Sequence, residues 1–167
     1  AGAEVATFTW RGDRAALVAA CRDADAVMTD YVPFDDAVLR ELPRLRLISV
    51  TGTVFDSVDV AAAAARGVRV AAVGEYCTDE VADHALALLL ALERRLFDYR
   101  RQVQDEHSWR WNDVTGIRRL AGQSLGLGGF GRIGQAVARR ASAFGMRILA
   151  ADPRVPDEVV EHHGAEP

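Results

Sequence analysis

A glycine-rich turn between two apolar segments constrains the fold of this chain more than any other feature of its sequence. The apolar run Ser124–Gly128 precedes the turn, and a second run, Arg147–Ala151, follows it. Between them, Arg132–Phe144 repeats apolar residues at helical spacing. The segment therefore predicts a strand, a helix and a second, parallel strand. The turn holds three glycines at the spacing G-x-G-x-x-G, namely Gly129, Gly131 and Gly134.

Each of these glycines has a physical role in a dinucleotide site. Gly129 allows a tight turn, Gly131 lets the backbone approach a pyrophosphate, and Gly134 lets the helix pack closely on the strand. The first amides of the helix, near Arg132 and Ile133, would face the phosphates with the positive end of the helix dipole behind them. The expected inward face of this helix consists of Ile133, Val137, Ala138 and Ala141.

An aspartate follows the second predicted strand. Asp152 lies eighteen residues after Gly134, where a carboxylate would accept hydrogen bonds from the ribose hydroxyls of adenosine. Its charge would repel a 2′-phosphate, which favours NAD over NADP, whereas Arg154, two positions later, softens that preference. The alternative is a turn that serves the backbone alone, with Asp152 as a capping residue.

The first half of the chain alternates short apolar runs with helical patterns. This alternation predicts an α/β fold in which helices cover a parallel sheet. Asp59 is a plausible helix cap and Gly67 a plausible left-handed helix terminator. The expected strands are Glu4–Phe8, Ala26–Thr29, Leu45–Val50 and Val68–Val73, and the expected helices are Asp13–Cys21, Asp35 or Asp36 to Leu42, and Val60–Arg66.

One long helix of about seven turns is expected from Thr78 or Asp79 onward. Acidic residues near its start and arginines near its end oppose the helix dipole at both ends. Such a helix serves as a domain connector, an oligomer interface or a simple covering helix. The polar stretch His107–Arg119, with Trp109 and Trp111, is expected to form a loop in which the tryptophans pack or lie at an interface.

Composition excludes several classes of protein. With 24 acidic and 20 basic residues and a net charge of −4, the chain has no basic excess to bind nucleic acid or an anionic membrane. Its longest apolar run, Ala85–Leu92, is too short to span a bilayer. Cys21 and Cys77 lie far apart, and no metal-ligand spacing is present, which favours the cytoplasm and predicts neither a disulfide nor a metal site.

Several linked blocks of this sequence resemble the NAD-dependent D-2-hydroxyacid dehydrogenase family. They are LRLISVTGTVFDSVDV, the run VAAVGEYCTDEVADHALALLLALERRL, the segment SWRW, and RRLAGQSLGLGGFGRIGQAVARRASAFGMRILAADP. The resemblance implies a partial flavodoxin-like substrate-binding domain over residues 1–78. It implies a long helix and the first βαβ unit of a Rossmann NAD-binding domain over residues 79–167. It further implies a homodimer, with the long helix near the hinge and the dimer contact, in a chain truncated at both ends.

The resemblance also assigns residues around the substrate. Thr53 is a cofactor-side candidate, and Gly52 and Val54 help to frame the substrate carboxylate. Family members usually carry glycine where Val54 stands, and asparagine and proline where Ala72 and Gly74 stand. If the loop needs a positive φ at Val54, a β-branched residue there is costly. A pocket that differs from the usual one is therefore expected.

The family's catalytic arginine, glutamate and histidine would all lie downstream of Pro167, so no catalytic residue is expected within this chain. The expected function of the parent protein is hydride transfer between NAD and a small 2-hydroxy or 2-keto acid, while the chain alone would not turn over. The alternative is a non-catalytic NAD(H)-sensing module or corepressor-like scaffold. A different Rossmann enzyme, such as a methyltransferase, does not fit the upstream blocks.

Overall fold

The computed structural model describes residues 2–167, and the chain divides into two compact units between Tyr76 and Cys77. Both units combine helices with parallel strands, so the predicted α/β class is confirmed. Each unit is described here by itself. Among the described residues, no helix combines the length and the apolar character that a membrane span requires.

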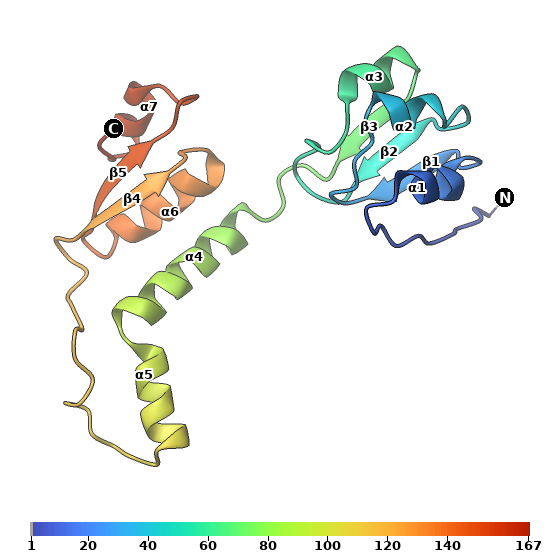
Figure 1. Ribbon diagram of the computed structural model, residues 1–167. Coiled ribbons are helices and arrows are strands. Elements are labelled where there is room, and N and C mark those ends of the chain that lie inside the picture. The colour runs from blue at the N-terminus through green and yellow to red at the C-terminus, as the bar shows by residue number, and fades with distance from the viewer. Residues whose placement is uncertain (1) are drawn as a thin grey trace. The chain divides into compact units, whose positions relative to one another are not determined.

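The first unit contains a parallel sheet with the strand order β1-β2-β3 (Figure 1). Val27 pairs with Ile48, and Ile48 pairs with Val70, which sets the register of the three strands. Side chains from all three helices join one apolar core with Ile48 and Val50 of β2. The elements are α1 (Arg14–Cys21), β1 (Ala26–Thr29), α2 (Asp36–Arg40), β2 (Leu47–Val50), α3 (Val60–Ala65) and β3 (Arg69–Ala72).

Aspartates begin all three of these helices. Asp13 caps α1, Asp35 caps α2 and Asp59 caps α3, and each carboxylate accepts hydrogen bonds from amides of the first turn. Gly67 follows α3 with a φ of +71°, so this helix ends at the left-handed residue expected from the sequence. These local signals explain why the helix positions were predictable.

The strand expected at Glu4–Phe8 is wrong. These residues form neither helix nor strand and are exposed to solvent. A strand is stable only when its amide and carbonyl groups pair with a neighbour, and Glu4–Phe8 pairs with neither edge of the described sheet. Apolar alternation by itself does not supply one.

The second unit contains the predicted strand–helix–strand segment. β4 (Ser124–Gly128) pairs in parallel with β5 (Arg147–Ala151), and α6 (Arg132–Ser142) lies along this pair (Figure 1). After α7 (Asp157–His162), Glu166 forms a parallel bridge to Leu149, on the side of β5 away from β4. Two hydrogen bonds of 2.8 Å fix this isolated bridge beside β5.

The predicted seven-turn helix is broken. α4 (Thr78–Glu93) ends before Arg95, which has a φ of +55°, and α5 (Leu96–Arg100) continues into a π-helical turn at Arg101–Asp105. The loop that returns from α5 holds this break. Arg118 pairs with Glu93 at 3.3 Å. The sequence pattern misses the break because these contacts join residues about 25 positions apart.

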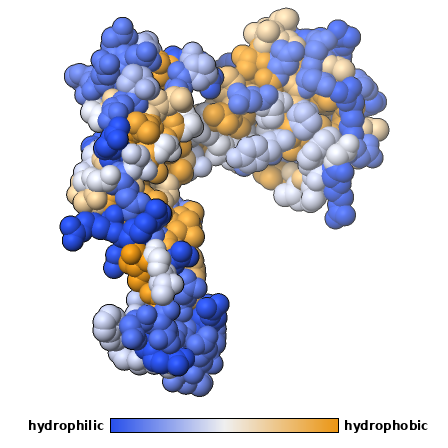
Figure 2. All heavy atoms as spheres, turned by 60° about the vertical axis from the view of Figure 1, so that its left-hand side comes forward, coloured by the Kyte–Doolittle hydropathy of each residue, from blue (hydrophilic) through white to orange (hydrophobic). Residues whose placement is uncertain are grey.

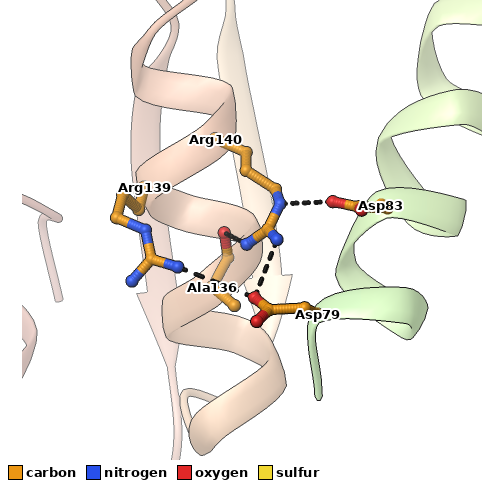
Figure 3. Close-up of polar contacts among 5 residues, drawn as sticks. All are labelled: Asp79, Asp83, Ala136, Arg139 and Arg140. Carbon is orange, nitrogen blue, oxygen red and sulfur yellow. Dashed lines mark hydrogen bonds and ion pairs between the residues drawn. The ribbon is translucent and has the colours of Figure 1, made fainter. Parts of the chain in front are cut away.

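Helix α4 packs against α6 through apolar residues and one arginine. Ala82 and Leu86 of α4 are buried in the core of the second unit. Above them, the Arg140 guanidinium donates to Asp83 at 2.6 Å and to Asp79 at 2.8 Å, and also donates to the Ala136 carbonyl at 3.1 Å (Figure 3). Three acceptors on two helices thus fix one planar donor group.

The arginine contact predicts a pH-dependent part of the stability. The hydrogen bond from Arg140, and then its charge, hold the pKa of Asp79 below its usual value of 3.8. A lowered native pKa stabilises the fold above the unfolded-state pKa, and this contribution disappears as the pH falls through the native pKa. We expect Arg140→Gln to lower the melting temperature at pH 7, and we expect this difference to shrink as the pH falls through the lowered native pKa of Asp79, as measured by circular dichroism.

Arg139→Gln is the matched control, because Arg139 reaches only Asp79, at 3.8 Å, and its side chain is 74% exposed. It should lower the melting temperature less than Arg140→Gln does. Equal effects of the two substitutions, or an Arg140→Gln effect that stays the same size as the pH is lowered, would show that the ion pairs do not stabilise the helix packing.

Candidate functional site

The glycine turn joins the end of β4 to the start of α6. Gly129 has a φ of +102°, a backbone conformation that an L side chain rarely adopts. Its amide donates to the Ala151 carbonyl at 2.8 Å and so ties the turn to the end of β5. The side-chain amide of Gln135 donates to the Phe130 carbonyl at 3.0 Å and holds the turn from the helix side.

Gly134 and Gly131 lack side chains for different reasons. A Cβ atom on Gly134 would lie 2.5 Å from the Gly129 carbonyl oxygen, which is closer than such atoms approach. Only glycine therefore lets α6 begin this near the strand. A Cβ atom on Gly131 would meet no atom within 4 Å, so packing does not require glycine there. The open space beside Gly131 is what a backbone approached by a ligand would show.

The start of α6 carries no side-chain cap. Gly131 occupies the cap position, and the first amides of a helix have no partner within it. Four buried residues, Ala136, Val137, Ala138 and Ala141, anchor the other turns in the core. The prediction that Ile133 points inward is wrong, because its side chain is 41% exposed beside this open helix end. Position 133 lies in the first turn, and the buried residues of α6 begin only at Ala136.

Asp152 faces the glycine turn from the end of β5. Its carboxylate accepts one hydrogen bond from the Phe130 amide and one from the Arg154 amide, each at 2.8 Å. These two amides, Phe130 first, hold the pKa of Asp152 below its usual value, so the group is charged at neutral pH. Each carboxylate oxygen keeps further lone pairs for a ligand hydroxyl.

An open pocket of about 460 Å³ lies next to Asp152. Pro153, Val155 and Val160 give it apolar walls, and Asp157 adds a second carboxylate. The sequence analysis missed these residues. Their position in the sequence could have identified them. The segment directly after Asp152, at the end of a strand, continues along the same edge of the sheet.

The Gly52–Val54 loop lies at the carboxyl edge of the sheet in the first unit. Thr51 donates to the Thr29 carbonyl at 2.9 Å, and Val73 donates to the Gly52 carbonyl at 3.2 Å, so this edge brings three strand ends together. Val54 is not among the residues with positive φ, and its side chain is exposed. The loop therefore accepts a β-branched residue without backbone strain.

Two further residues at this edge were not predicted. The Asp30 carboxylate lies 3.5 Å from the position that a Cβ atom on Gly52 would take. Tyr31 has a φ of +55°, and its ring extends into solvent. A non-glycine residue with positive φ is uncommon and often lies at a functional edge. The expected differences at Ala72 and Gly74 also lie here, and Gly74 has a φ of +80°.

The remaining polar candidates have structural explanations. His163 packs against Phe130 with a ring-centroid distance of 5.8 Å, and its Nδ1 lies 2.8 Å from the Val159 carbonyl oxygen. Cys21 and Cys77 are free, and burial raises the pKa of the Cys21 thiol. Within residues 2–167, no group of histidine, cysteine, aspartate and glutamate is arranged to hold a metal ion.

Comparison with known proteins identifies the family. Residues 1–161 match the family described as D-isomer specific 2-hydroxyacid dehydrogenase, catalytic domain. The chain therefore belongs to the D-isomer specific 2-hydroxyacid dehydrogenases, as the sequence blocks indicated.

Individual relatives agree with this assignment. The chain is 40% identical over 144 residues to D-3-phosphoglycerate dehydrogenase of Mycobacterium tuberculosis, covering 86% of this chain and 27% of the relative. It is 34% identical over 160 residues to glycerate dehydrogenase of Methylorubrum extorquens, covering 92% and 49% respectively. The chain thus spans half or less of the length of these relatives.

Solved structures show the same fold. The TT0316 protein of Thermus thermophilus matches with a TM-score of 0.76 and 34% identity, covering 92% of this chain and 50% of that one. D-lactate dehydrogenase of Aquifex aeolicus, solved with NAD and lactic acid, matches with a TM-score of 0.75 and 28% identity, covering 89% and 44%.

Alanine substitution is expected to have different effects on stability at two glycines of the turn. Gly134→Ala should lower the free energy of unfolding by about 1–3 kcal/mol, because the new methyl group collides with the Gly129 carbonyl. Gly131→Ala should leave the stability nearly unchanged, because its methyl group meets open space. Urea unfolding followed by circular dichroism measures both. Equal destabilisation by the two substitutions would contradict the close helix–strand approach.

Proposed function

We propose that the complete protein is an NAD-dependent oxidoreductase that interconverts a 2-hydroxy acid and a 2-keto acid. One observation carries the proposal: the charged Asp152 is hydrogen-bonded across the glycine turn to the Phe130 amide, beside the uncapped start of α6. This arrangement supplies a ribose acceptor and phosphate-binding amides at one edge of a parallel sheet. Membership of the dehydrogenase family supports the same reading.

The residues at the glycine turn would hold the cofactor. Gly131 leaves room for the pyrophosphate, and the amides of Arg132, Ile133 and Gly134 face it from the helix start. Asp152 would bind the ribose hydroxyls, and the neighbouring apolar pocket suits an adenine ring. NAD, when bound, accepts or delivers the hydride.

The loop at the carboxyl edge of the first sheet would hold the substrate. We assign the amides of Gly52–Val54 to the substrate carboxylate and Thr53 to the cofactor side, as the family resemblance implies. The exposed Val54 side chain would narrow the space available to the substrate relative to glycine.

The proton-transfer group and the substrate arginine belong, in this proposal, to the part of the relatives that the chain does not span. A histidine with a pKa near 6.5 is suited to exchange the hydroxyl proton as the hydride moves. The four histidines of the sequence all lie in the Cys77–Pro167 unit, and one of them, His163, is occupied by packing on Phe130. The chain alone would bind the cofactor without turnover.

We further propose that the protein is a cytoplasmic homodimer. Figure 2 shows apolar patches on both units, and in the Cys77–Pro167 unit several large apolar side chains of α4 and α5 are exposed. Trp109 and Trp111 are 82% and 73% exposed, so neither packs within the described chain, and a partner subunit would bury them. The exposed apolar residues of the two helices are Val81, Leu88, Leu92, Leu96 and Phe97.

The complete gene product should oxidise NADH when a 2-keto acid is added, as followed at 340 nm. Turnover with at least one member of a panel of glyoxylate, hydroxypyruvate, pyruvate and 3-phosphohydroxypyruvate is the expected result. Tight NADH binding without turnover of any of these acids would contradict the proposed enzymatic activity. It would favour the alternative of a non-catalytic, nucleotide-sensing module. Sedimentation equilibrium of the same preparation tests the homodimer.

Asp152 should control the choice of cofactor. Asp152→Asn keeps an acceptor but removes the charge that repels a 2′-phosphate, so we expect the preference for NAD over NADP to fall by about tenfold or more. The measurement is the ratio of dissociation constants for NADH and NADPH. Asp157→Asn, which neutralises a carboxylate in the same pocket away from the turn, is the control. An unchanged ratio in Asp152→Asn would refute the assigned role.

A further inference from the structure

A second open pocket, of about 680 Å³, lies where the strands of the first sheet begin. Its charged lining consists of four arginines and a single carboxylate, that of Asp25. The first unit as a whole is acidic, with eight arginines and eleven aspartates and glutamates up to Tyr76. Half of the arginines of an acidic unit thus line one pocket. The four are Arg44, Arg46, Arg66 and Arg69.

The backbone fixes the position of these residues. Arg46 donates its amide to the Asp25 carbonyl at 2.8 Å, and Arg69 donates its amide to the Arg46 carbonyl at 2.9 Å. The starts of three neighbouring strands are therefore joined in a row. Arg46 and Arg69 both line the pocket from rigid, adjacent strand ends, which reduces the ordering cost of binding a ligand there.

Two of the four arginines already have partners. Arg44 pairs with Asp25 at 3.1 Å, and Arg66 pairs with Asp36 and donates to the Ala62 carbonyl, both at 2.8 Å. Arg66 thereby neutralises the carboxyl end of α3, an ordinary role for a cation at that position. These contacts explain why Arg44 and Arg66 are present.

The other two arginines have no such explanation. Within residues 2–167, neither Arg46 nor Arg69 has a side-chain hydrogen bond or an ion pair. Neither guanidinium donates to the carbonyls at a helix end. Two uncompensated positive charges beside Arg44 leave the pocket with an excess of positive charge that no described residue neutralises.

We infer that this pocket binds a small polyvalent anion, one that carries two or more phosphate or carboxylate groups. Guanidinium groups bind such oxygens through paired, charge-assisted hydrogen bonds. A monovalent anion would engage one arginine, whereas a polyvalent anion spans Arg46 and Arg69 together. The pocket lies at the opposite end of the strands from the Gly52–Val54 loop, so a ligand there does not occupy the proposed substrate position.

Calorimetric titration of this chain with inorganic pyrophosphate and with citrate, at low ionic strength, tests the inference. Saturable 1:1 binding is expected, and it should weaken steeply as salt is added because the groups are exposed. Arg46→Ala and Arg69→Ala should each weaken binding about tenfold. Asp25→Asn should tighten it severalfold, because the substitution releases Arg44 and removes the negative charge. Arg11→Ala changes the net charge equally, outside the pocket, and should have no effect.

Asp25→Asn is expected to change the affinity for the anion in the opposite direction to the arginine substitutions, which makes the experiment decisive. If Arg11→Ala weakens binding as much as Arg46→Ala does, the anion responds to net charge alone and the site is refuted. Weaker binding by Asp25→Asn, or no saturable binding by the unsubstituted chain, refutes it as well. Because none of these measurements involves NAD or turnover, the result is independent of the proposed dehydrogenase activity.

Discussion

The approach of α6 to the end of β4 is the constraint on which the candidate cofactor site depends. The contact exists only because position 134 has no Cβ atom, which would lie 2.5 Å from the Gly129 carbonyl oxygen. With α6 held this close, the turn stays short enough for the Phe130 amide to reach Asp152. The same helix position presents Arg140 to α4. The absence of one methyl group at position 134 therefore positions both the candidate cofactor site near Asp152 and the contact of α6 with α4.

Features that depend on neighbouring residues were predictable from the sequence. Asp59 caps its helix, Gly67 ends it, and β4, α6 and β5 lie where the alternation of patterns placed them. The α/β class follows from the same alternation, because each strand run is short and each connection is a helix. The requirement for glycine at positions 129 and 134 was also predicted, since backbone geometry and close packing act over a few residues.

Features that depend on distant residues were not predictable in the same way. The helix break at Arg95 is held by a loop about 25 residues further along, and the stretch Glu4–Phe8 does not pair with the described sheet. Ile133 fits a helical periodicity that takes no account of where the helix meets the sheet. The bond between Asp152 and the Phe130 amide likewise appears only when β4 and β5 are aligned, although the acidic residue itself was identified.

In the first unit, the two proposed binding sites lie at opposite ends of the parallel strands. In open α/β sheets, ligands bind at the carboxyl ends of the strands. The Gly52–Val54 loop proposed for the substrate lies at such an end, as does, in the second unit, the glycine turn proposed for the cofactor. The arginine pocket lies at the amino ends, where helices point their negative carboxyl ends. Some positive charge is therefore expected there on structural grounds, and Arg66 supplies it at α3. Arg46 and Arg69 exceed that requirement, because they extend from strand ends and neutralise no helix. Their excess charge, fixed on adjacent strands, is what a bound anion would balance.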